Sequence, residues 1–293
     1  MNTQSLRADF LLLVTATIWG SAFVAQRMGM DHIGPLTFNA VRFALGAASL
    51  IPLILFMQSR RPAGINTATP KQLMRNGGLM GLALFFGASF QQWGVVYTTA
   101  GKAGFITGLY VVLVPIMGLC FKHATNKQTW IGAGLAVAGM YLLSVTDSFT
   151  LEFGDLLVLV SAFFWAGHVL LVGFTSPGID STDAVKLASV QFACCAILSG
   201  LSALVLETIT LSGIIAASGP ILFGGLCSVG IAYTLQVIAQ HDAPPAHAAI
   251  ILSLEAVFAV LAGWLILDET MTLRALLGCG IMLVGMLISQ IKQ

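Results

Sequence analysis

Long apolar stretches separated by short polar breaks follow one another along the whole chain. A helix needs roughly 20 apolar residues to cross the hydrocarbon core of a bilayer, which is about 30 Å thick. Stretches that approach or reach this length cover residues 10–29, 35–57, 73–96, 103–121, 128–145, 155–174, 183–206, 213–240, 245–267 and 273–291. The breaks between them leave no room for a folded domain outside the membrane. The pattern therefore predicts an all-α, polytopic membrane protein with ten transmembrane helices.

The second half of the chain repeats the first at an interval of about 145 residues. Trp19 falls on Trp165 with a shift of 146 residues, and Tyr110 falls on Glu255 with a shift of 145. Self-similarity over such an interval indicates a duplicated structural unit. The repeat is asymmetric near the middle of one span, where only the second copy carries a carboxylate.

Each repeat unit contains five of the predicted spans. We place the two units at residues 1–146 and 147–293. Because five is an odd number, the second unit must enter the membrane from the face opposite to the first. Inverted repeats of this kind are typical of transporters that alternate between inward-open and outward-open states around a site near the midplane.

Composition supports the membrane assignment and excludes several functions. Hydrophobic residues make up 57% of the chain and charged residues only 9%, against about 25% charged residues in soluble domains. A net charge of +1 gives no electrostatic basis for binding nucleic acid. The five cysteines lie in or beside apolar stretches, so we interpret them as packing residues. We expect no metal and no cofactor.

Lysine and arginine are distributed unequally between the two ends of the predicted spans, and basic residues are enriched in cytoplasmic loops. Only three of these basic residues lie on the side of the membrane opposite to the amino terminus, and many more lie on the amino-terminal side. The latter are Arg7, Arg60, Arg61, Lys71, Arg75, Lys122, Lys127, Lys186 and Lys292. We therefore expect a multi-pass protein of the cell (inner) membrane with both termini in the cytoplasm.

Arg42 and Glu255 are the two charged side chains that lie well inside predicted spans. A charge near the bilayer centre costs about 2.5–3.5 kcal/mol on insertion scales, so it usually faces a cavity or a partner. At 1.5 Å per residue the two residues differ in depth by only about 5 Å, which allows them to pair. A structural ion pair, an arginine that caps backbone carbonyls, and contact with a charged substrate group or a proton all remain open.

Trp19 and Trp165 occur about ten residues into their spans. Tryptophan in membrane proteins usually belongs to the interfacial belts. A deep tryptophan can form the wall of a binding cavity, because its ring packs flat and its N–H donates. The alternative is a core tryptophan whose N–H is satisfied by a neighbouring helix.

Further polar side chains inside the spans are Gln91, Tyr110, His168, Tyr233 and Gln236. Amide side chains can orient an amino acid or a similar metabolite, and they can equally lock helices together. His168 is a candidate proton relay or a hydrogen-bonded core residue. The chain contains no phosphate-binding loop, no His-Glu-x-x-His motif and no Gly-x-Ser-x-Gly motif, so we expect no enzyme activity.

These features together resemble the EamA-type family of the drug/metabolite transporter superfamily. The matching runs are Ile18-Trp19-Gly20, Val41-Arg42-Phe43, Leu113-Val114-Pro115, Ser253-Leu254-Glu255 and Leu267-Asp268-Glu269. Ala256 departs from the proline that often follows the glutamate, so a helix kink at this position is not implied. The resemblance covers nearly the whole chain and implies an exporter of amino acids, related metabolites or drugs.

We therefore expect a secondary transporter that exports a small organic metabolite by alternating access. The substrate site would include Trp19, Gln91, Tyr110, Trp165, His168, Tyr233, Gln236 and Glu255. The expected partners are the lipid bilayer and a small-molecule substrate, with proton coupling through Glu255 as an addition and a monomer or homodimer as the assembly. Efflux of multiple drugs or cationic compounds is the alternative, followed by a membrane-embedded enzyme or a channel.

Overall fold

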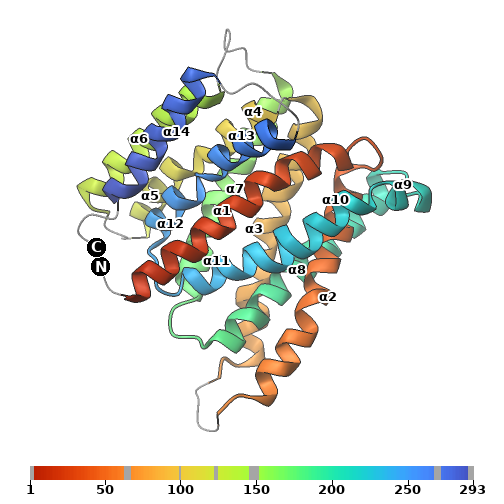
Figure 1. Ribbon diagram of the computed structural model, residues 1–293. Helices are drawn as coiled ribbons and strands as arrows, with labels where there is room; N and C mark the ends of the chain where they lie inside the picture. Colours follow the sequence, from red (N-terminus) through yellow and green to blue (C-terminus); the bar gives the residue numbers. More distant parts are fainter. Residues whose placement is uncertain are drawn as a thin grey trace.

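The computed structural model describes residues 3–62, 67–98, 100–121, 125–144, 152–266 and 272–289. Over these residues the regular secondary structure is entirely helical, which confirms the predicted fold class (Figure 1). The first half contains α1 (Thr3–Gly29), α2 (Pro35–Ser59), α3 (Pro70–Tyr97), α4 (Ala100–Gly108), α5 (Tyr110–Cys120) and α6 (Lys127–Ser144).

The second half begins with two long helices and then divides into shorter ones. It contains α7 (Phe153–Thr175), α8 (Ser181–Leu206), α9 (Leu211–Ala216), α10 (Ser218–Leu222), the π-helix η1 (Phe223–Tyr233), α11 (Thr234–Ala239), α12 (Pro245–Leu252), α13 (Glu255–Ile266) and α14 (Leu273–Ser289). Prolines begin α2, α3 and α12, where a missing N–H costs no helical hydrogen bond.

Each predicted span corresponds to a helix or to a run of consecutive helices. By length and composition, eight segments of the described chain could cross a membrane: α1, α2, α3, α4 with α5, α7, α8, α10 through α11, and α12 with α13. The two remaining positions hold α6, which is outside this set, and α14, which is a shorter apolar helix of 17 residues. The protein is therefore a multi-pass membrane protein, and the number of ten crossings stays a prediction.

The repeat-equivalent helices α2 and α8 pack against each other in opposite directions. At one end, Glu207 after α8 accepts hydrogen bonds of 2.8 Å from the backbone N–H groups of Leu36 and Thr37 at the start of α2. At the other end, Arg61 beyond α2 lies 2.9 Å from Asp183 in the first turn of α8. Polar contacts therefore join these two antiparallel helices at both ends.

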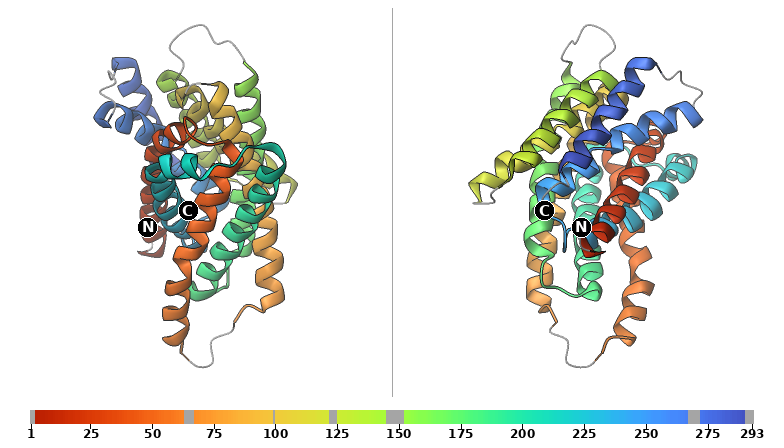
Figure 2. Two further views of the ribbon diagram at one scale, coloured as in Figure 1. Left: turned by 90° about the vertical axis from the view of Figure 1, so that its right-hand side faces the viewer. Right: turned by 60° about the vertical axis from the view of Figure 1, so that its left-hand side comes forward.

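The helices α6 and α14, which are also repeat equivalents, form a second antiparallel pair (Figures 1 and 2). Their backbones approach so closely that a Cβ atom on Gly132 would lie 2.7 Å from the carbonyl oxygen of Gly285. A Cβ on Gly139 would lie 2.6 Å from the carbonyl oxygen of Gly278. Small residues permit this approach in membrane bundles. Since the repeat places Gly132 on Gly278 and Gly139 on Gly285, the contacts relate the two halves by a pseudo-two-fold axis.

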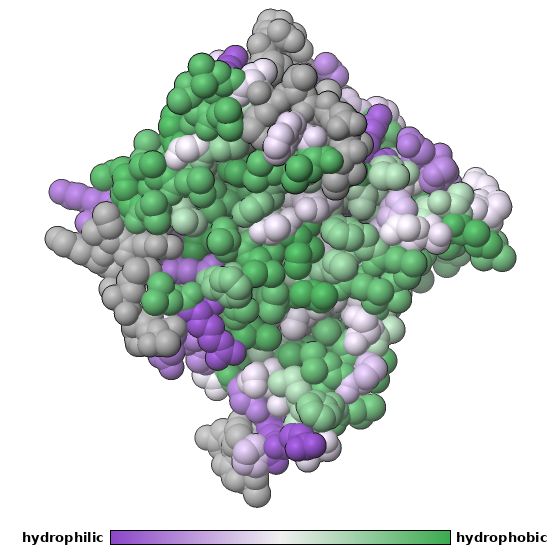
Figure 3. Space-filling model, viewed as in Figure 1, coloured by the Kyte–Doolittle hydropathy of each residue, from purple (hydrophilic) through white to green (hydrophobic). Residues whose placement is uncertain are grey.

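The remaining helix contacts follow the same symmetry. The helix α3 packs against α7 and α8, and its counterpart η1 packs against α1 and α2. Likewise α13 contacts α1, while α4 and α5 contact α7. A two-repeat architecture fits this arrangement. Apolar side chains cover the centre of the face in Figure 3, and polar ones lie mainly toward its margins, as expected for a surface that faces lipid.

Candidate functional site

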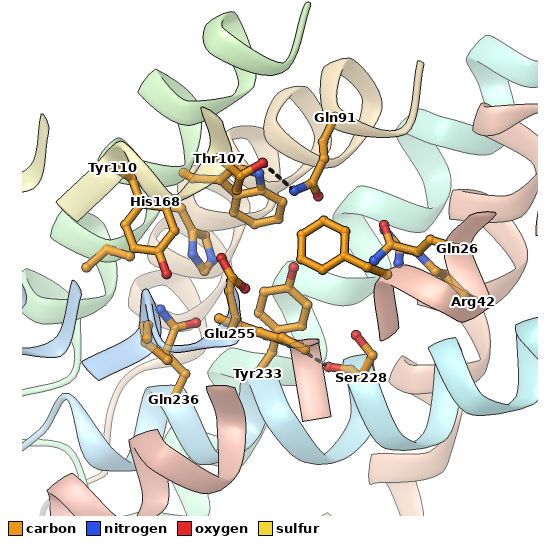
Figure 4. A pocket seen from close by; sticks show the side chains of 15 residues that line it. Gln26, Arg42, Gln91, Thr107, Tyr110, His168, Ser228, Tyr233, Gln236 and Glu255 are labelled. Atoms are coloured by element: carbon orange, nitrogen blue, oxygen red, sulfur yellow. Dashed lines mark hydrogen bonds between the residues drawn. The ribbon is translucent and has the colours of Figure 1, made fainter. Parts of the chain in front are cut away.

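A cavity of about 40 Å³ lies inside the bundle where helices of both halves converge (Figure 4). Seven of its 15 lining residues come from the first half and eight from the second. They are Trp19, Phe23, Gln26, Arg42, Gln91, Thr107, Tyr110, Trp165, His168, Val169, Ser228, Tyr233, Gln236, Leu252 and Glu255. All the site residues expected from the sequence are therefore brought together around one space.

Tyr233, near the end of η1, is the centre of an aromatic cluster on the cavity wall. Its ring centroid lies 4.5 Å from that of Trp19 and 6.1 Å from that of Trp165, with which it is nearly parallel at 19°. His168 meets it edge-on at 6.0 Å. The two repeat-equivalent tryptophans thus contact the same tyrosine, and the cluster joins the two halves of the molecule.

The π-helix gives Trp19 and Trp165 different environments. The indole N–H of Trp19 donates to the backbone carbonyl of Ser228 in η1 at 3.2 Å, and Thr15 donates to the carbonyl of Ala232 at 3.2 Å. The indole N–H of Trp165 is buried and has no hydrogen-bond partner among the described residues. Short π-helical segments are frequent at functional sites. Here the segment satisfies one tryptophan and leaves its equivalent with a free donor.

Two helices that line the cavity are interrupted at equivalent positions. In the first half α4 ends at Gly108 and Tyr110 begins α5, with the single residue Leu109 between them. In the second half α12 ends at Leu252 and Glu255 begins α13. The second break occurs although residue 256 is alanine and not proline. Discontinuous helices of this kind form midplane binding sites in transporters.

Local hydrogen bonds explain the interruption before Glu255. The Ser253 hydroxyl donates to the carbonyl of Ile250 at 2.8 Å, and the N–H of Leu254 bonds the carbonyl of Ile251 at 3.1 Å, three residues back. Serine side chains that bond the preceding turn compete with the regular ladder. The break therefore needs no proline, and it places the Glu255 carboxyl in the cavity wall.

Helix α1 reaches the backbone at Glu255 because residue 20 is glycine. A Cβ on Gly20 would lie 2.5 Å from the carbonyl oxygen of Glu255 and 2.7 Å from the backbone nitrogen of Ala259. Backbone atoms at these distances cannot move aside as a flexible side chain can. The glycine after Trp19 is thus required for the contact between α1 and α13.

The glutamine side chains partly lock helices together. The Gln91 amide donates to the Thr107 hydroxyl at 3.0 Å. The Gln236 amide donates to Gln240 at 2.9 Å, and Gln240 donates in turn to the backbone carbonyl of Val169 at 2.9 Å. These bonds connect α3 to α4 and α11 to α7. Gln91 and Gln236 also line the cavity, and the interpretation that they orient a solute stays a prediction.

His168 makes a hydrogen bond of 2.7 Å through its Nε2 atom to the Oε1 atom of Gln191 in α8. Only 1% of His168 is exposed, and its ring also meets that of Trp165 edge-on at 6.1 Å. This environment fits the interpretation of His168 as a hydrogen-bonded core residue. The relay function stays a hypothesis.

Arg42 is held by neighbours on its own helix and makes no ion pair with Glu255 among the described residues. Its Nε atom donates to Asn39 at 3.0 Å, and its guanidinium group lies over the rings of Phe38 and Phe43 at 5.2 and 5.0 Å. The sequence places Arg42 and Glu255 at similar depth. In the structure both side chains line one cavity, but they do not pair directly.

Several buried polar atoms on the cavity wall have no hydrogen-bond partner in the described structure. They are the Gln26 Oε1, Trp165 Nε1 and Gln236 Oε1 atoms. The Tyr110 hydroxyl and the Glu255 carboxyl, which are also buried there, interact with each other. Each buried unsatisfied group costs about 1–3 kcal/mol, and such groups are normally satisfied by ordered water or a ligand. Their concentration in one cavity, with both donors and acceptors, makes this cavity the candidate functional site.

Comparison with known proteins agrees with this architecture. The model of the EamA-like transporter family matches residues 6–145 and, a second time, residues 152–290. The chain belongs to the EamA-like transporter family. It is therefore a membrane transporter, and the expected family is confirmed.

Individual relatives support the same assignment. A protein of Archaeoglobus fulgidus described as an uncharacterized transporter is 32% identical to this EamA-like transporter, over 99% of the chain and 88% of the relative. The uncharacterized inner membrane transporter YedA of Escherichia coli K12 is 26% identical over 90% of the chain and 84% of the relative. A crystal structure with 16% sequence identity has a TM-score of 0.76, covers 97% of this chain and 96% of its own, and shares the fold.

Six cavity residues of this EamA-like transporter were not predicted from the sequence. They are Phe23, Gln26, Thr107, Val169, Ser228 and Leu252. Helical spacing could have identified some of them, because Phe23 follows Trp19 by four residues and Val169 follows Trp165 by four. The family run Leu267-Asp268-Glu269 lies outside the described residues.

Proposed function

We propose that this protein is a secondary transporter for small organic metabolites such as amino acids, and that the cavity holds the solute near the membrane midplane. The observation that carries the proposal is the group of unpartnered buried polar atoms where the two halves meet. The interrupted helices that present Tyr110 and Glu255 support it, because helix breaks supply binding groups at membrane depth.

Alternating access is the mechanism that fits the cavity and its surroundings. A cavity of about 40 Å³ is well below the roughly 300–1,000 Å³ of most ligand pockets. A solute would therefore require the two halves to separate. We infer an inverted relation between units 1–146 and 147–293, supported by the antiparallel packing of α2 with α8 and of α6 with α14. We also propose that the chain crosses the membrane ten times, that both termini are cytoplasmic and that the solute is exported.

Buried polar contacts at opposite ends of the molecule are suited to act as two gates. At the end that carries the amino terminus, His247 of α12 bonds Asp9 of α1 at 2.7 Å and lies 3.3 Å from the Ser289 hydroxyl of α14. At the other end, Thr98 after α3 donates to Asp155 in the first turn of α7. Asp9 and Asp155 are repeat equivalents, separated by 146 residues. Alternate breaking of these contacts would open one face at a time.

Uptake and exchange in proteoliposomes test the transport function. The purified chain would be reconstituted and loaded with radiolabelled amino acids, nucleosides or cationic dyes, with empty liposomes as the control. We expect saturable exchange of one class, accelerated by the same unlabelled solute on the opposite side. Absence of exchange for all classes, or single-channel currents in planar bilayers, would rule out this proposal.

Proton coupling through Glu255 is part of the proposal. Glu255 is 5% exposed, and its carboxyl lies in the cavity wall beside the Tyr110 hydroxyl, where a proton and a solute could compete for it. We predict that Glu255→Gln abolishes the stimulation of transport by a pH gradient while the protein still folds. The measurement is uptake into liposomes with and without an imposed gradient.

The matched control for this variant is Asp31→Asn, which removes one carboxylate from the exposed turn after α1. It should leave gradient-driven uptake unchanged. If the Glu255→Gln protein is folded and retains the full response to the gradient, proton coupling through this residue is wrong.

Efflux of organic cations is the second candidate, and one observation favours it. A carboxyl group beside an aromatic cluster of Trp19, Trp165 and Tyr233 is a common environment for binding cations. Arg42 lines the same cavity and opposes this reading, because it would repel a solute that carries only positive charge.

A further inference from the structure

We propose that a second pocket, at the membrane surface, binds a phospholipid whose headgroup carries a phosphate and a primary ammonium group, as in phosphatidylethanolamine. The pocket has a volume of about 210 Å³ and lies between α1 of the first half and the helices α8 and α11 of the second. None of its lining residues belongs to the central cavity. Occupation of this pocket by a lipid therefore does not depend on which solute is transported.

The pocket lies at the depth of lipid headgroups. The apolar segments that surround it begin or end there: Gln4–Gly29 and Ser181–Leu206 begin at the pocket, and Ser218–Ala239 ends at it. Apolar spans end where the hydrocarbon core meets the headgroup region. In Figure 3, hydrophilic residues gather beside the start of α1, next to an apolar surface. The pocket is thus placed at the boundary between lipid and water, on the face that carries the amino terminus.

One group of lining residues can hold a phosphate. Arg7 is exposed and makes no hydrogen bond or ion pair with the described residues. The Gln4 amide and the Ser181 hydroxyl line the same pocket and are neutral donors. Ser181 begins the 26-residue helix α8, whose amino-terminal end carries a partial positive charge. The carboxylate of Asp180 beside it is paired with Arg61 at 2.7 Å, which reduces its repulsion of an anion.

A second group of lining residues can hold an ammonium group. His241 and Asp242 follow the end of α11, and the His241 Nδ1 atom lies 2.7 Å from the Asp242 Oδ1 atom. Because a carboxylate only accepts, the bonded Nδ1 carries a proton, and a neutral imidazole then has its acceptor at Nε2. This Nε2 atom and the second oxygen of Asp242 can accept from an ammonium group. The carbonyl end of a helix favours a cation as well.

The two groups stay separate within the protein. Arg7 and Asp242 line one pocket but form no ion pair with each other in the described part of the chain. A headgroup with one negative and one positive charge can satisfy both. A choline group has no N–H to donate, and a glycerol group has no positive charge, so headgroups that end in these groups match the pocket less well.

Apolar residues provide a surface for the acyl chains. Leu11, Ile179 and Ile238 line the pocket, and Leu6 and Phe10 on α1 are 50% and 64% exposed. A pocket of about 210 Å³ is smaller than the roughly 300–1,000 Å³ of sites that enclose a whole small molecule. A headgroup therefore fits inside while the chains lie along α1. This apolar surface favours a lipid over a water-soluble phosphate ester.

A series of headgroups tests the site on the unmodified protein. The full chain, freed of lipid in a mild detergent, would be titrated with phosphatidylethanolamine, phosphatidylcholine and phosphatidylglycerol that have identical acyl chains. Binding to the folded state raises the unfolding temperature. We expect phosphatidylethanolamine to do so at concentrations about tenfold below those of the other two, because only its headgroup can form charge-assisted hydrogen bonds to both groups. Equal or stronger stabilisation by either of the other lipids overturns the proposal.

Glycerophosphoethanolamine, which is the same headgroup without acyl chains, distinguishes a lipid from a water-soluble ester. We expect it to bind at least about tenfold more weakly than the lipid, because it buries no acyl surface. If it stabilises the protein as well as the lipid does, the pocket binds a soluble ester and the assignment to a membrane lipid is wrong.

Substitutions assign the two groups of residues. Asp242→Asn should remove the preference for phosphatidylethanolamine over phosphatidylcholine, whereas Arg7→Gln should weaken the binding of all three lipids, since all contain the phosphate. Asp242→Glu retains the charge and should retain part of the preference. Arg75→Gln and Asp31→Asn, at exposed positions outside the pocket, are the matched controls and should behave like the unmodified protein. A folded Asp242→Asn protein that keeps the full preference contradicts the ammonium site.

Discussion

At the scale of single residues, Trp19 and Trp165 show how a repeated sequence places equivalent side chains in different environments. Both tryptophans contact Tyr233. The Trp19 N–H donates to the backbone carbonyl of Ser228, whereas the Trp165 N–H has no partner in the described part of the chain. The difference arises in the opposing helix, which is the π-helix η1 for Trp19 and the regular helix α3 for Trp165. Trp19 therefore connects two helices, and we propose that the Trp165 N–H donates to a solute.

Replacing each tryptophan by phenylalanine should separate these two contributions. Trp19→Phe loses a hydrogen bond between helices and should reduce the free energy of unfolding by about 0.5–1.5 kcal/mol. Trp165→Phe loses no hydrogen bond to the described residues, so its free energy of unfolding should change less while its KM for transport rises. Unfolding curves and uptake kinetics of the two variants check this, and identical effects of both variants would contradict it.

Gly20 permits a second prediction at this scale. Gly20→Ala would place a Cβ atom 2.5 Å from the Glu255 carbonyl oxygen, and we expect a loss of about 1–3 kcal/mol of unfolding free energy from overpacking. Transport should fall as well, because α13 carries Glu255. Gly134→Ala in α6 is the matched control, since nothing lies within 4 Å of a Cβ there. If both variants were equally stable, α1 and α13 could move apart without a loss of unfolding free energy, and the prediction would be wrong.

At the scale of elements, interruptions organise the site. The apolar stretches 103–121 and 245–267 predict continuous helices, whereas the structure divides them at Leu109 and at Ser253–Leu254. The divided helices bring Tyr110 and Glu255 to the same cavity. Hydrophobic length alone cannot indicate such a break, because the serine bond and the three-residue backbone bonds that produce it are local details of the folded chain.

The contact between α1 and α12 gives a prediction at the scale of elements. Asp9→Asn should weaken the bond to His247, and we expect the end that carries the amino terminus to open more often. The reporter is a cysteine at Ala248, which is fully buried in α12, in a protein whose five native cysteines are replaced by alanine. A membrane-impermeant thiol reagent applied from that side should label it faster, and labelling unchanged relative to the Asp31→Asn control would exclude a gate there.

At the scale of the whole molecule, pseudo-two-fold packing explains why a site forms at the centre. Helices of both halves line the cavity. The two pairs of repeat-equivalent helices, α2 with α8 and α6 with α14, join the halves. Polar contacts of Asp9 and Asp155 lie at opposite ends. The cavity is therefore formed jointly by the two halves.

The sequence by itself determined the membrane class, the helical fold, the duplication and the family, because these depend on composition, hydrophobic length and motifs spread over the chain. It also predicted the main cavity residues, since deep polar and aromatic side chains must avoid lipid. Only the tertiary structure decided that Arg42 bonds Asn39 and not Glu255, and that the Trp165 N–H has no hydrogen-bond partner in the described part of the chain. Such outcomes depend on ångström-scale distances between atoms that the packing of distant helices brings together.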